Sequence, residues 1–170
     1  MSQPTWRIER IRPGEPGWFD AVHLKRSRAY RIVARDTGLS VGAIHELYEG
    51  KAIRGGLPFH EAMLRAEIAD RPLLLFHEGD VPVGYACMGT TTLIETNIRA
   101  CIVTDICLDD DLSPMDRAAW CIRVVHEAQA TGAENVQVTV DGADARTMED
   151  LGGERFKSTW HWRTFEPRDR

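Results

Sequence analysis

The chain has 170 residues, of which 43% are hydrophobic and 28% are charged, so we expect one globular domain over residues 1–170 with a sizeable core. Its formal net charge of -5 lacks the basic surface that nucleic acid or an anionic membrane would attract, and we expect neither as a partner. No apolar run approaches the roughly 20 residues that span a bilayer, and the N-terminus lacks the apolar segment of a signal peptide, so we expect a cytoplasmic protein.

The beginning of the chain predicts one strand and two helices. Apolar and polar residues alternate over residues 6–12, which is typical of a strand. After a turn rich in Pro and Gly, apolar residues recur at helical spacing over residues 18–36, and Gly38 follows as a helix stop. Ser40 can cap a second helix, which has a narrow apolar side.

Residues 33–48 are also similar in spacing to a helix-turn-helix, in which small residues let two helices cross closely and the second helix enters the major groove of DNA. The second helix here carries His45, Glu46 and Glu49, and carboxylates that face phosphates oppose binding. We therefore favour two short helices that pack beside a sheet.

A loop and a third helix precede a predicted β-hairpin. Two glycines indicate a loop over residues 51–58, and the apolar spacing after it predicts a helix to about residue 70. Two apolar runs follow, joined at residues 78–80, where Gly-Asp between strands is a hairpin signal. Gly84 inside the second run indicates a bulge or a close approach of another backbone.

The segment of residues 98–132 predicts a strand, an acidic loop and an amphipathic helix. Its apolar run is rich in β-branched residues, and three carboxylates at residues 109–111 follow that run. Ser113 can cap the helix, Pro114 suits its first position, and Asp116 completes a capping box.

The end of the chain predicts two more strands around a short helix. Valines alternate over residues 135–140, a short apolar helix covers residues 145–151, and residues 156–165 form a closing strand with two tryptophans. Those tryptophans would suit the interface of a homodimer. Trp120, on the polar side of the preceding long helix, would suit packing either against a partner subunit or against its own chain.

We expect no metal site. The four cysteines lie in apolar segments without a CxxC or Cys/His spacing, so they should be reduced core residues. The carboxylates of residues 109–111 could bind a divalent cation, but we favour a solvated loop that caps a helix.

The order of these elements resembles the GNAT family of acyl-CoA-dependent N-acetyltransferases over residues 6–165. Residues 106–108 stand where the family's fourth strand ends in a Leu-Tyr-Val-like triplet, and residues 144–152 look like its late segment that ends in Leu-Gly-Phe. The resemblance implies an α/β (α+β) fold with a mixed central sheet of about six or seven strands and helices on both faces. It also implies transfer of an acyl group from acetyl-CoA or another acyl-CoA to a small-molecule amine.

The resemblance further implies which residues would bind the cofactor. Backbone groups of Ile106, Cys107 and Leu108 would pair with the pantetheine arm like an added strand. The start of the following helix would hold the pyrophosphate with free backbone N–H groups. The residues in this second group are Ser113, Met115, Asp116, Arg117 and Ala118.

The chain departs from the family pattern at this loop. The family's Gln or Arg, its Gly, and its second Gly or Ala fall on Ser113, Asp116 and Ala118, and only Ala118 conforms. The nearby carboxylates oppose a polyanion, because two unit charges at roughly 4 Å interact with about 4 kcal/mol at an effective dielectric of about 20. Met148 stands in place of the family's usual Tyr acid. A second hypothesis is therefore a GNAT-like fold without acyl-CoA binding, with other small-molecule chemistry or a binding or regulatory role.

Asp105 is the candidate base, which would act directly or through water, since it lies on the strand face opposite Ile106 and Leu108. The alternative for Asp105 is a carboxylate that is hydrogen-bonded near a strand end for structural reasons. If the second helix flanks the cleft as in the family, its residues His45, Glu46 and Glu49 would favour a cationic amine as substrate.

Overall fold

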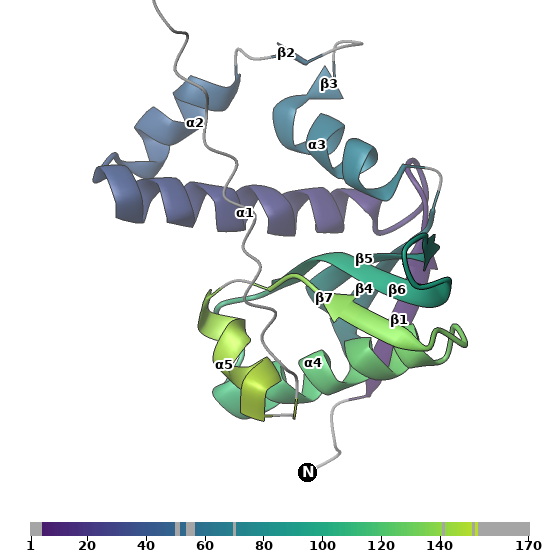
Figure 1. Cartoon of the computed structure of the whole chain (residues 1–170). Helices are drawn as coiled ribbons and strands as arrows, with labels where there is room; N and C mark the ends of the chain where they lie inside the picture. Colours follow the sequence, from purple (N-terminus) through teal and green to yellow (C-terminus); the bar gives the residue numbers. More distant parts are fainter. Residues whose placement is uncertain are drawn as a thin grey trace, which may run out of the picture.

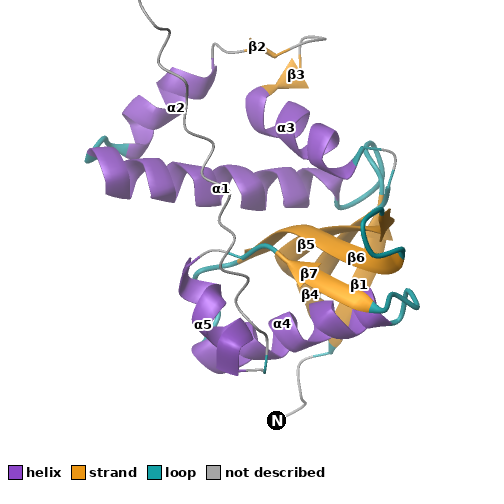
Figure 2. Ribbon diagram, in the orientation of Figure 1, coloured by secondary structure: helices purple, strands orange, loops and turns teal. Residues whose placement is uncertain are grey.

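The computed structural model describes residues 5–49, 52–53, 57–69, 71–140, 142–150 and 152. A five-stranded mixed sheet forms its centre (Figures 1 and 2). The first four strands in spatial order pair antiparallel, whereas the last two pair parallel. In this order the strands are β1 (Trp6–Ile11), β4 (Leu73–Glu78), β5 (Val81–Leu93), β6 (Ile98–Leu108) and β7 (Asn135–Val138).

Helices cover both faces of the sheet. On one face lies α1 (Trp18–Thr37), and on the other lie α4 (Pro114–Gln129) and α5 (Gly142–Asp150) (Figure 2). On the α1 side are also α2 (Val41–Glu49) and α3 (Phe59–Ile68), with α2 across α1 from the sheet (Figure 1). The predicted α+β fold, with a mixed sheet and helices on both faces, is confirmed.

One prediction about strands differs from the structure, and another falls on residues that the structure does not describe. Residues 51–58, predicted as a loop, include the two short strands of a separate sheet, β2 (Ala52–Ile53) and β3 (Leu57–Pro58). Strands of two residues leave no alternating pattern in a sequence, so periodicity could not reveal them. The predicted closing strand, residues 156–165, lies outside the described residues, so the described main sheet has five strands and the predicted six or seven stays a prediction.

The hairpin predicted at residues 78–80 joins β4 to β5. Its register shifts between Phe76 and His77, next to Gly84, the partner of Phe76. A Cβ atom on Gly84 would lie 2.6 Å from the carbonyl oxygen of Cys107. Both features that Gly84 predicted are therefore present, a bulge beside it and a close approach of another backbone, and that backbone is β6.

The sheet has a hydrophobic core on each face. On the α4 side, Trp120 is fully buried, and its ring stacks on Trp6 and Phe76 with centroids 5.0 and 4.9 Å away. Trp120 therefore packs against its own chain, which is one of the two predicted arrangements. On the α1 side, the core includes Trp18 and Tyr85. The four cysteines are buried and free, as predicted.

Two helices begin at the predicted caps. The Oγ atom of Ser113 accepts a hydrogen bond from the N–H of Asp116 at 3.1 Å, and Ser40 accepts one from the N–H of Ala43 at 3.2 Å. The second helix, α2, buries Ile44 completely. Among the described residues, no helix combines the length and the apolar character that crossing a membrane requires.

Candidate functional site

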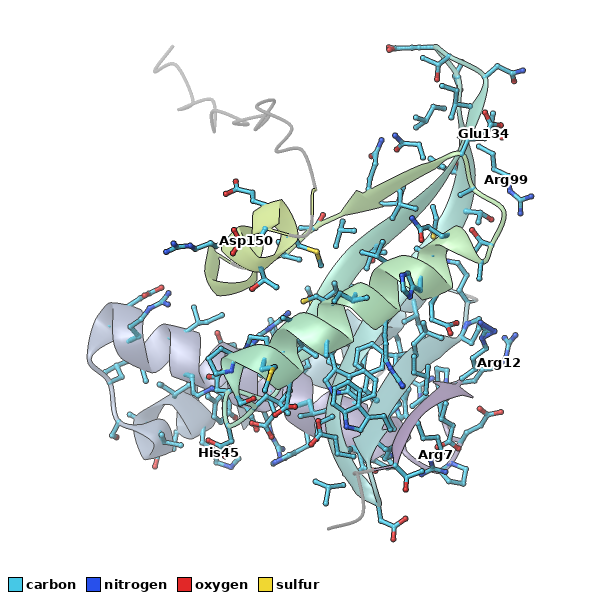
Figure 3. All side chains as sticks on the ribbon, turned by 90° about the horizontal axis from the view of Figure 1, so that it is seen from below. Arg7, Arg12, His45, Arg99, Glu134 and Asp150 are labelled. Carbon is cyan, nitrogen blue, oxygen red and sulfur yellow. The ribbon has the colours of Figure 1, made fainter. Side chains whose placement is uncertain are left out.

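Strand β6 extends past its neighbour β7. Their segments first meet where the N–H of Glu134 donates to the carbonyl of Arg99 at 2.8 Å (Figure 3). The last bond is from the N–H of Thr139 to the carbonyl of Val103 at 2.9 Å. Residues 104–108 continue β6, and no described strand pairs with them on the β7 side. The triplet predicted to bind pantetheine therefore lies beyond the end of β7, on a stretch of β6 whose edge on that side pairs with no described strand.

The triplet itself is buried and alternates between the two cores. Ile106 and Leu108 belong to the core under α4, and Cys107 belongs to the core under α1. The carbonyl of Ile106 accepts a hydrogen bond from Nη1 of Arg28 at 2.7 Å. A side chain of α1 thus occupies one of the backbone acceptors that the family resemblance assigns to pantetheine.

Asp105, the predicted base, lies among charged and polar groups between β6 and α1. Its Oδ1 atom accepts a hydrogen bond from Arg28 at 2.7 Å. Its Oδ2 atom accepts one from the Tyr85 hydroxyl at 2.8 Å and lies 3.6 Å from Nζ of Lys25. Burial alone would raise the pKa of Asp105, but the charge and hydrogen bond of Arg28, with Lys25 and Tyr85, lower it below its ordinary value.

A second carboxylate reaches the same lysine from α3. Oε1 of Glu67 accepts a hydrogen bond from Nζ of Lys25 at 2.7 Å, while Oε2 is buried with no hydrogen-bond partner among the described residues. Burial raises the pKa of Glu67 above its ordinary value, although Lys25 acts in the opposite direction. Lys25 therefore contacts one carboxylate that is held in its charged form and one that takes up a proton more readily.

The acidic loop after β6 is held by arginines from two helices. Asp110 forms an ion pair with Nε of Arg31, on α1, at 2.6 Å, and it accepts a hydrogen bond from Nη2 of Arg117, on α4, at 3.3 Å. Arg117 also donates to the carbonyl of Asp109 at 3.0 Å. The Asp110 side chain is 57% exposed and that of Arg117 is 16% exposed. An exposed carboxylate thus stands between two guanidinium groups at the end of β6.

The first turn of α4 has fewer free N–H groups than predicted. The N–H of Asp116 donates to Oγ of Ser113, and the N–H of Arg117 donates to the Ser113 carbonyl at 2.9 Å. The prediction that these two groups are free is wrong, because the capping box and the helix itself use them. The side chain of Met115 is 80% exposed at the same end of the helix.

A cavity of about 220 Å³ lies between α1 and this corner. Ser27 and Arg31 line it from α1, and Cys107, Leu108 and Asp109 line it from the end of β6. Its volume is below the roughly 300–1,000 Å³ of pockets that enclose drug-sized ligands. The cavity is therefore large enough for a fragment of a ligand, such as one charged group, rather than for a whole cofactor.

The residues predicted to bind the amine lie on α2. His45 (labelled in Figure 3) is exposed, and its Nδ1 atom is 3.1 Å from the Tyr30 hydroxyl. Glu46 is exposed, and the side chain of Glu49 lies outside the described residues. Because α1 lies between α2 and the sheet, it separates these residues from Asp105 (Figure 1).

Sequence reasoning missed the cations and the carboxylate that contact Asp105 or Lys25. A signal was present, because Ala21, Leu24, Lys25 and Arg28 follow the spacing i, i+3, i+4, i+7 of one helix face, on which Lys25 is buried and Arg28 is half-buried. Charged groups on the inner face of a helix need partners, so this spacing predicts ion pairs for Lys25 and Arg28. Glu67 gave a weaker signal, since it precedes the buried Ile68 on α3.

Several solved structures are similar to this chain. A presumed acetyl transferase from Pyrococcus furiosus superposes with a TM-score of 0.60 at 16% identity, covering 89% of this chain and 95% of its own. An aminoglycoside acetyltransferase from an uncultured soil metagenomic sample, in complex with sisomicin, gives 0.54 at 12% identity, covering 93% of this chain and 95% of its own. A transcriptional regulator from Bacillus halodurans C-125 gives 0.55 at 16% identity, with 88% and 93% covered.

No protein-family model matches the sequence, and the search of curated proteins gives no match. At 12 to 16% identity, the structural similarities concern the fold and leave the chemistry to the residues of this chain. The layout of strands and helices that the sequence predicted is also the layout of these proteins over most of their length. The chain therefore has the fold of the GNAT acetyltransferases.

Proposed function

We propose that this protein is a GNAT-type N-acyltransferase, which transfers an acyl group from acetyl-CoA or another acyl-CoA to a small amine. The observation that carries the proposal is the convergence of Arg31 and Arg117 on Asp110 at the end of β6. Two guanidinium groups around one carboxylate stabilise an anion at that point. Asp110 is exposed, so it can swing into solvent and leave this place to a pyrophosphate group.

The residues at this corner fit acyl-CoA in charge and in position. Arg31 and Arg117 would bind the pyrophosphate, and the unpaired edge of residues 104–108 would orient the pantetheine arm. When bound, acyl-CoA supplies the activated thioester. The chain's own task is then to hold the amine next to this edge and to accept the proton that the ammonium group loses.

Glu67 is the proton acceptor in this proposal. Its pKa is raised by burial, which brings a carboxylate closer to the range where a general base works well. Asp105, with its lowered pKa, is a weaker base, and here it positions Lys25 and Tyr85 beside the edge of β6. Lys25 connects the two carboxylates, so the acceptor lies one side chain away from the strand that the thioester would follow.

A second candidate function is a GNAT fold that no longer binds acyl-CoA. The bond from Arg28 to the Ile106 carbonyl favours it, because this half-buried guanidinium fills part of the edge that pantetheine would use. In that case the corner of Asp110 would be a structural ion-pair network, and the fold would have another small-molecule or regulatory role.

Titration calorimetry with CoA and acetyl-CoA decides between the two. For the acyltransferase we expect micromolar binding, and we expect Asp110→Asn to strengthen it by about two- to fivefold, since an exposed ion pair contributes up to about 1 kcal/mol. Arg117→Gln should weaken it by about tenfold, as the loss of a charged hydrogen bond does. Glu95→Gln is the charge control, because it removes the same charge from the exposed turn between β5 and β6, at the other end of β6, and should leave the affinity unchanged. No binding to any variant would establish the second candidate.

Kinetics of the Glu67→Gln and Asp105→Asn variants test the proposed base. We expect Glu67→Gln to remove the acidic limb of the pH profile of kcat/KM, and Asp105→Asn to lower kcat while the limb remains. If Asp105→Asn removes the limb instead, the base is Asp105, as its position on the strand predicted.

A further inference from the structure

Three arginines line a second pocket, which lies away from the corner of Asp110. The pocket has a volume of about 360 Å³. Its walls are Arg12 and Pro13, which follow β1, and Arg65, Ala69 and Arg71, which lie at the end of α3 and just after it. The β1–α1 and α3–β4 connections lie side by side at this end of the sheet (Figure 1). The residues of α1 that line the first cavity begin at His23, one turn or more beyond this end of the helix.

Arg65 is held in position by contacts with Glu61 and Trp18. Its Nε and Nη2 atoms donate to Oε1 of Glu61 at 3.2 and 2.9 Å, and its guanidinium carbon lies 5.6 Å from the ring centre of Trp18. Glu61 is only 6% exposed and also accepts a hydrogen bond from Nε1 of Trp18 at 3.1 Å. The carboxylate that partners Arg65 is thus buried in the protein, and the guanidinium keeps further N–H donors for a ligand.

Arg71 packs over Gly89, a residue that has no side chain. A Cβ atom on Gly89 of β5 would lie 1.4 Å from Nη1 of Arg71, so the guanidinium sits directly over this glycine. Its Nε atom donates to the carbonyl of Ile68 at 3.4 Å, and Arg71 makes no ion pair within the part of the chain that the structure describes. A guanidinium fixed over a strand without a carboxylate partner is ready to bind an anion.

From these observations we infer that the pocket of Arg12, Arg65 and Arg71 binds a multiply charged oxyanion of a small ligand, either a phosphate ester or a polycarboxylate. Guanidinium groups match the oxygen atoms of both groups with paired hydrogen bonds. The volume leaves room for the anionic group and part of the molecule that carries it. This site is separate from the proposed acyl-CoA corner and does not depend on the proposed acyl transfer.

The test is titration of the full chain with inorganic phosphate, pyrophosphate and citrate at low ionic strength, where charge attraction is least screened. We expect at least one of them to bind, with Arg71→Gln weakening its affinity by about tenfold. Gly89→Ala should weaken it similarly without changing any charge, because the new methyl group displaces the Arg71 guanidinium. Stronger binding of the phosphates points to a phosphate ester, and stronger binding of citrate points to a polycarboxylate.

Two control variants separate this pocket from general charge effects. Arg7→Gln removes a cation at the opposite end of β1 from Arg12 (Figure 3), and Gly42→Ala adds a methyl group on exposed α2; both should leave the affinity unchanged. If none of the three anions binds the wild-type chain, the inference is overturned. It is equally overturned if Arg117→Gln abolishes the binding while Arg71→Gln and Gly89→Ala preserve it, because the anion then sits at the Asp110 corner.

Discussion

The two faces of the central sheet are built from different chemistry. On the face under α4, the rings of Trp6, Phe76 and Trp120 stack in one column, and Arg123 covers the rings of Trp6 and Trp120 at 5.0 and 5.4 Å. The indole N–H of Trp120 donates to Glu78 at 3.2 Å, so the polar atom of this large side chain is satisfied. Burial of such rings contributes directly to stability.

The face under α1 buries charges as well as apolar groups. Lys25 and Arg28 enter it from α1, Glu67 enters it from α3, and Asp105 enters it from β6. Removing these groups from water is unfavourable, and their mutual attraction offsets that penalty only when the geometry is good. An apolar face of the same volume would therefore give similar or greater stability. We infer that the α4 face mainly stabilises the fold and that the charges of the α1 face serve the site.

The largest effect we expect is on the α4 face. Trp120→Ala should lower the free energy of unfolding by about 3–5 kcal/mol, because it leaves a cavity between Trp6 and Phe76. Urea unfolding followed by circular dichroism measures it. Ile122→Ala on the same helix is the control, and it should lose much less because Ile122 is already 37% exposed. Equal losses for the two variants would contradict the assignment of stability to the aromatic column.

The two faces also differ in how far the sequence predicts them. The strand and helix of residues 98–132 follow local patterns, and the cap at Ser113 is a local signal, so both were correctly predicted. Only the tertiary packing reveals that Trp120 is buried, because this residue of α4 is covered by Trp6 and Phe76, which lie on strands far away in sequence.

The α1 face was predictable only in part. The position of Asp105 near the end of a strand was clear, but its partner Arg28 lies 77 residues earlier, and Glu67 reaches Lys25 across 42 residues. Such ion pairs depend on how a helix is rotated on the sheet, which local periodicity indicates only as a buried stripe. The same limit applies to the Asp110 corner, where the acidic residues were visible in sequence but the two arginines that hold them were not assigned to them.

Removing one charge from the α1 face should have the next largest effect on stability. Arg28→Met leaves Asp105 and the Ile106 carbonyl without their shared donor, and we expect a loss of about 3 kcal/mol in the free energy of unfolding. The double variant Arg28→Met with Asp105→Leu should recover more than half of that loss, because it replaces a charge pair by apolar groups. A double variant that is no more stable than the single one would mean that these charges do stabilise the fold.

The pH dependence of unfolding should distinguish the two carboxylates that share Lys25. The pKa of Asp105 is lowered on folding, so its contribution is present above its unfolded pKa of about 3.9 and is lost as the pH falls through the folded value. The pKa of Glu67 is raised, so its contribution is present below about 4.3 and is lost as the pH rises through the folded value.

Asp105→Asn should therefore flatten the decrease in stability on the acidic side of about pH 4, and Glu67→Gln should flatten the decrease above about pH 4.3. The measurement is the urea midpoint across this range. Glu46→Gln, an exposed carboxylate on α2, is the control and should change neither slope. If both variants change the dependence of stability on pH in the same direction, the pKa values of Asp105 and Glu67 are not shifted in opposite directions.

The smallest effect is expected for the loss of a helix cap, which can be compared on the two sides of the sheet. Ser113→Ala removes the acceptor for the N–H of Asp116, and Ser40→Ala removes the acceptor for the N–H of Ala43. The loss of a cap is worth about 1 kcal/mol in each helix.

Because α4 packs directly on the sheet, the whole loss at Ser113 should appear in global unfolding. Because α2 packs across α1, it can fray while the sheet stays folded, so hydrogen exchange in α2 should increase with little change in the global midpoint. A full global loss for Ser40→Ala would mean that α2 unfolds together with the sheet, and that the α1 side is as cooperative as the α4 side.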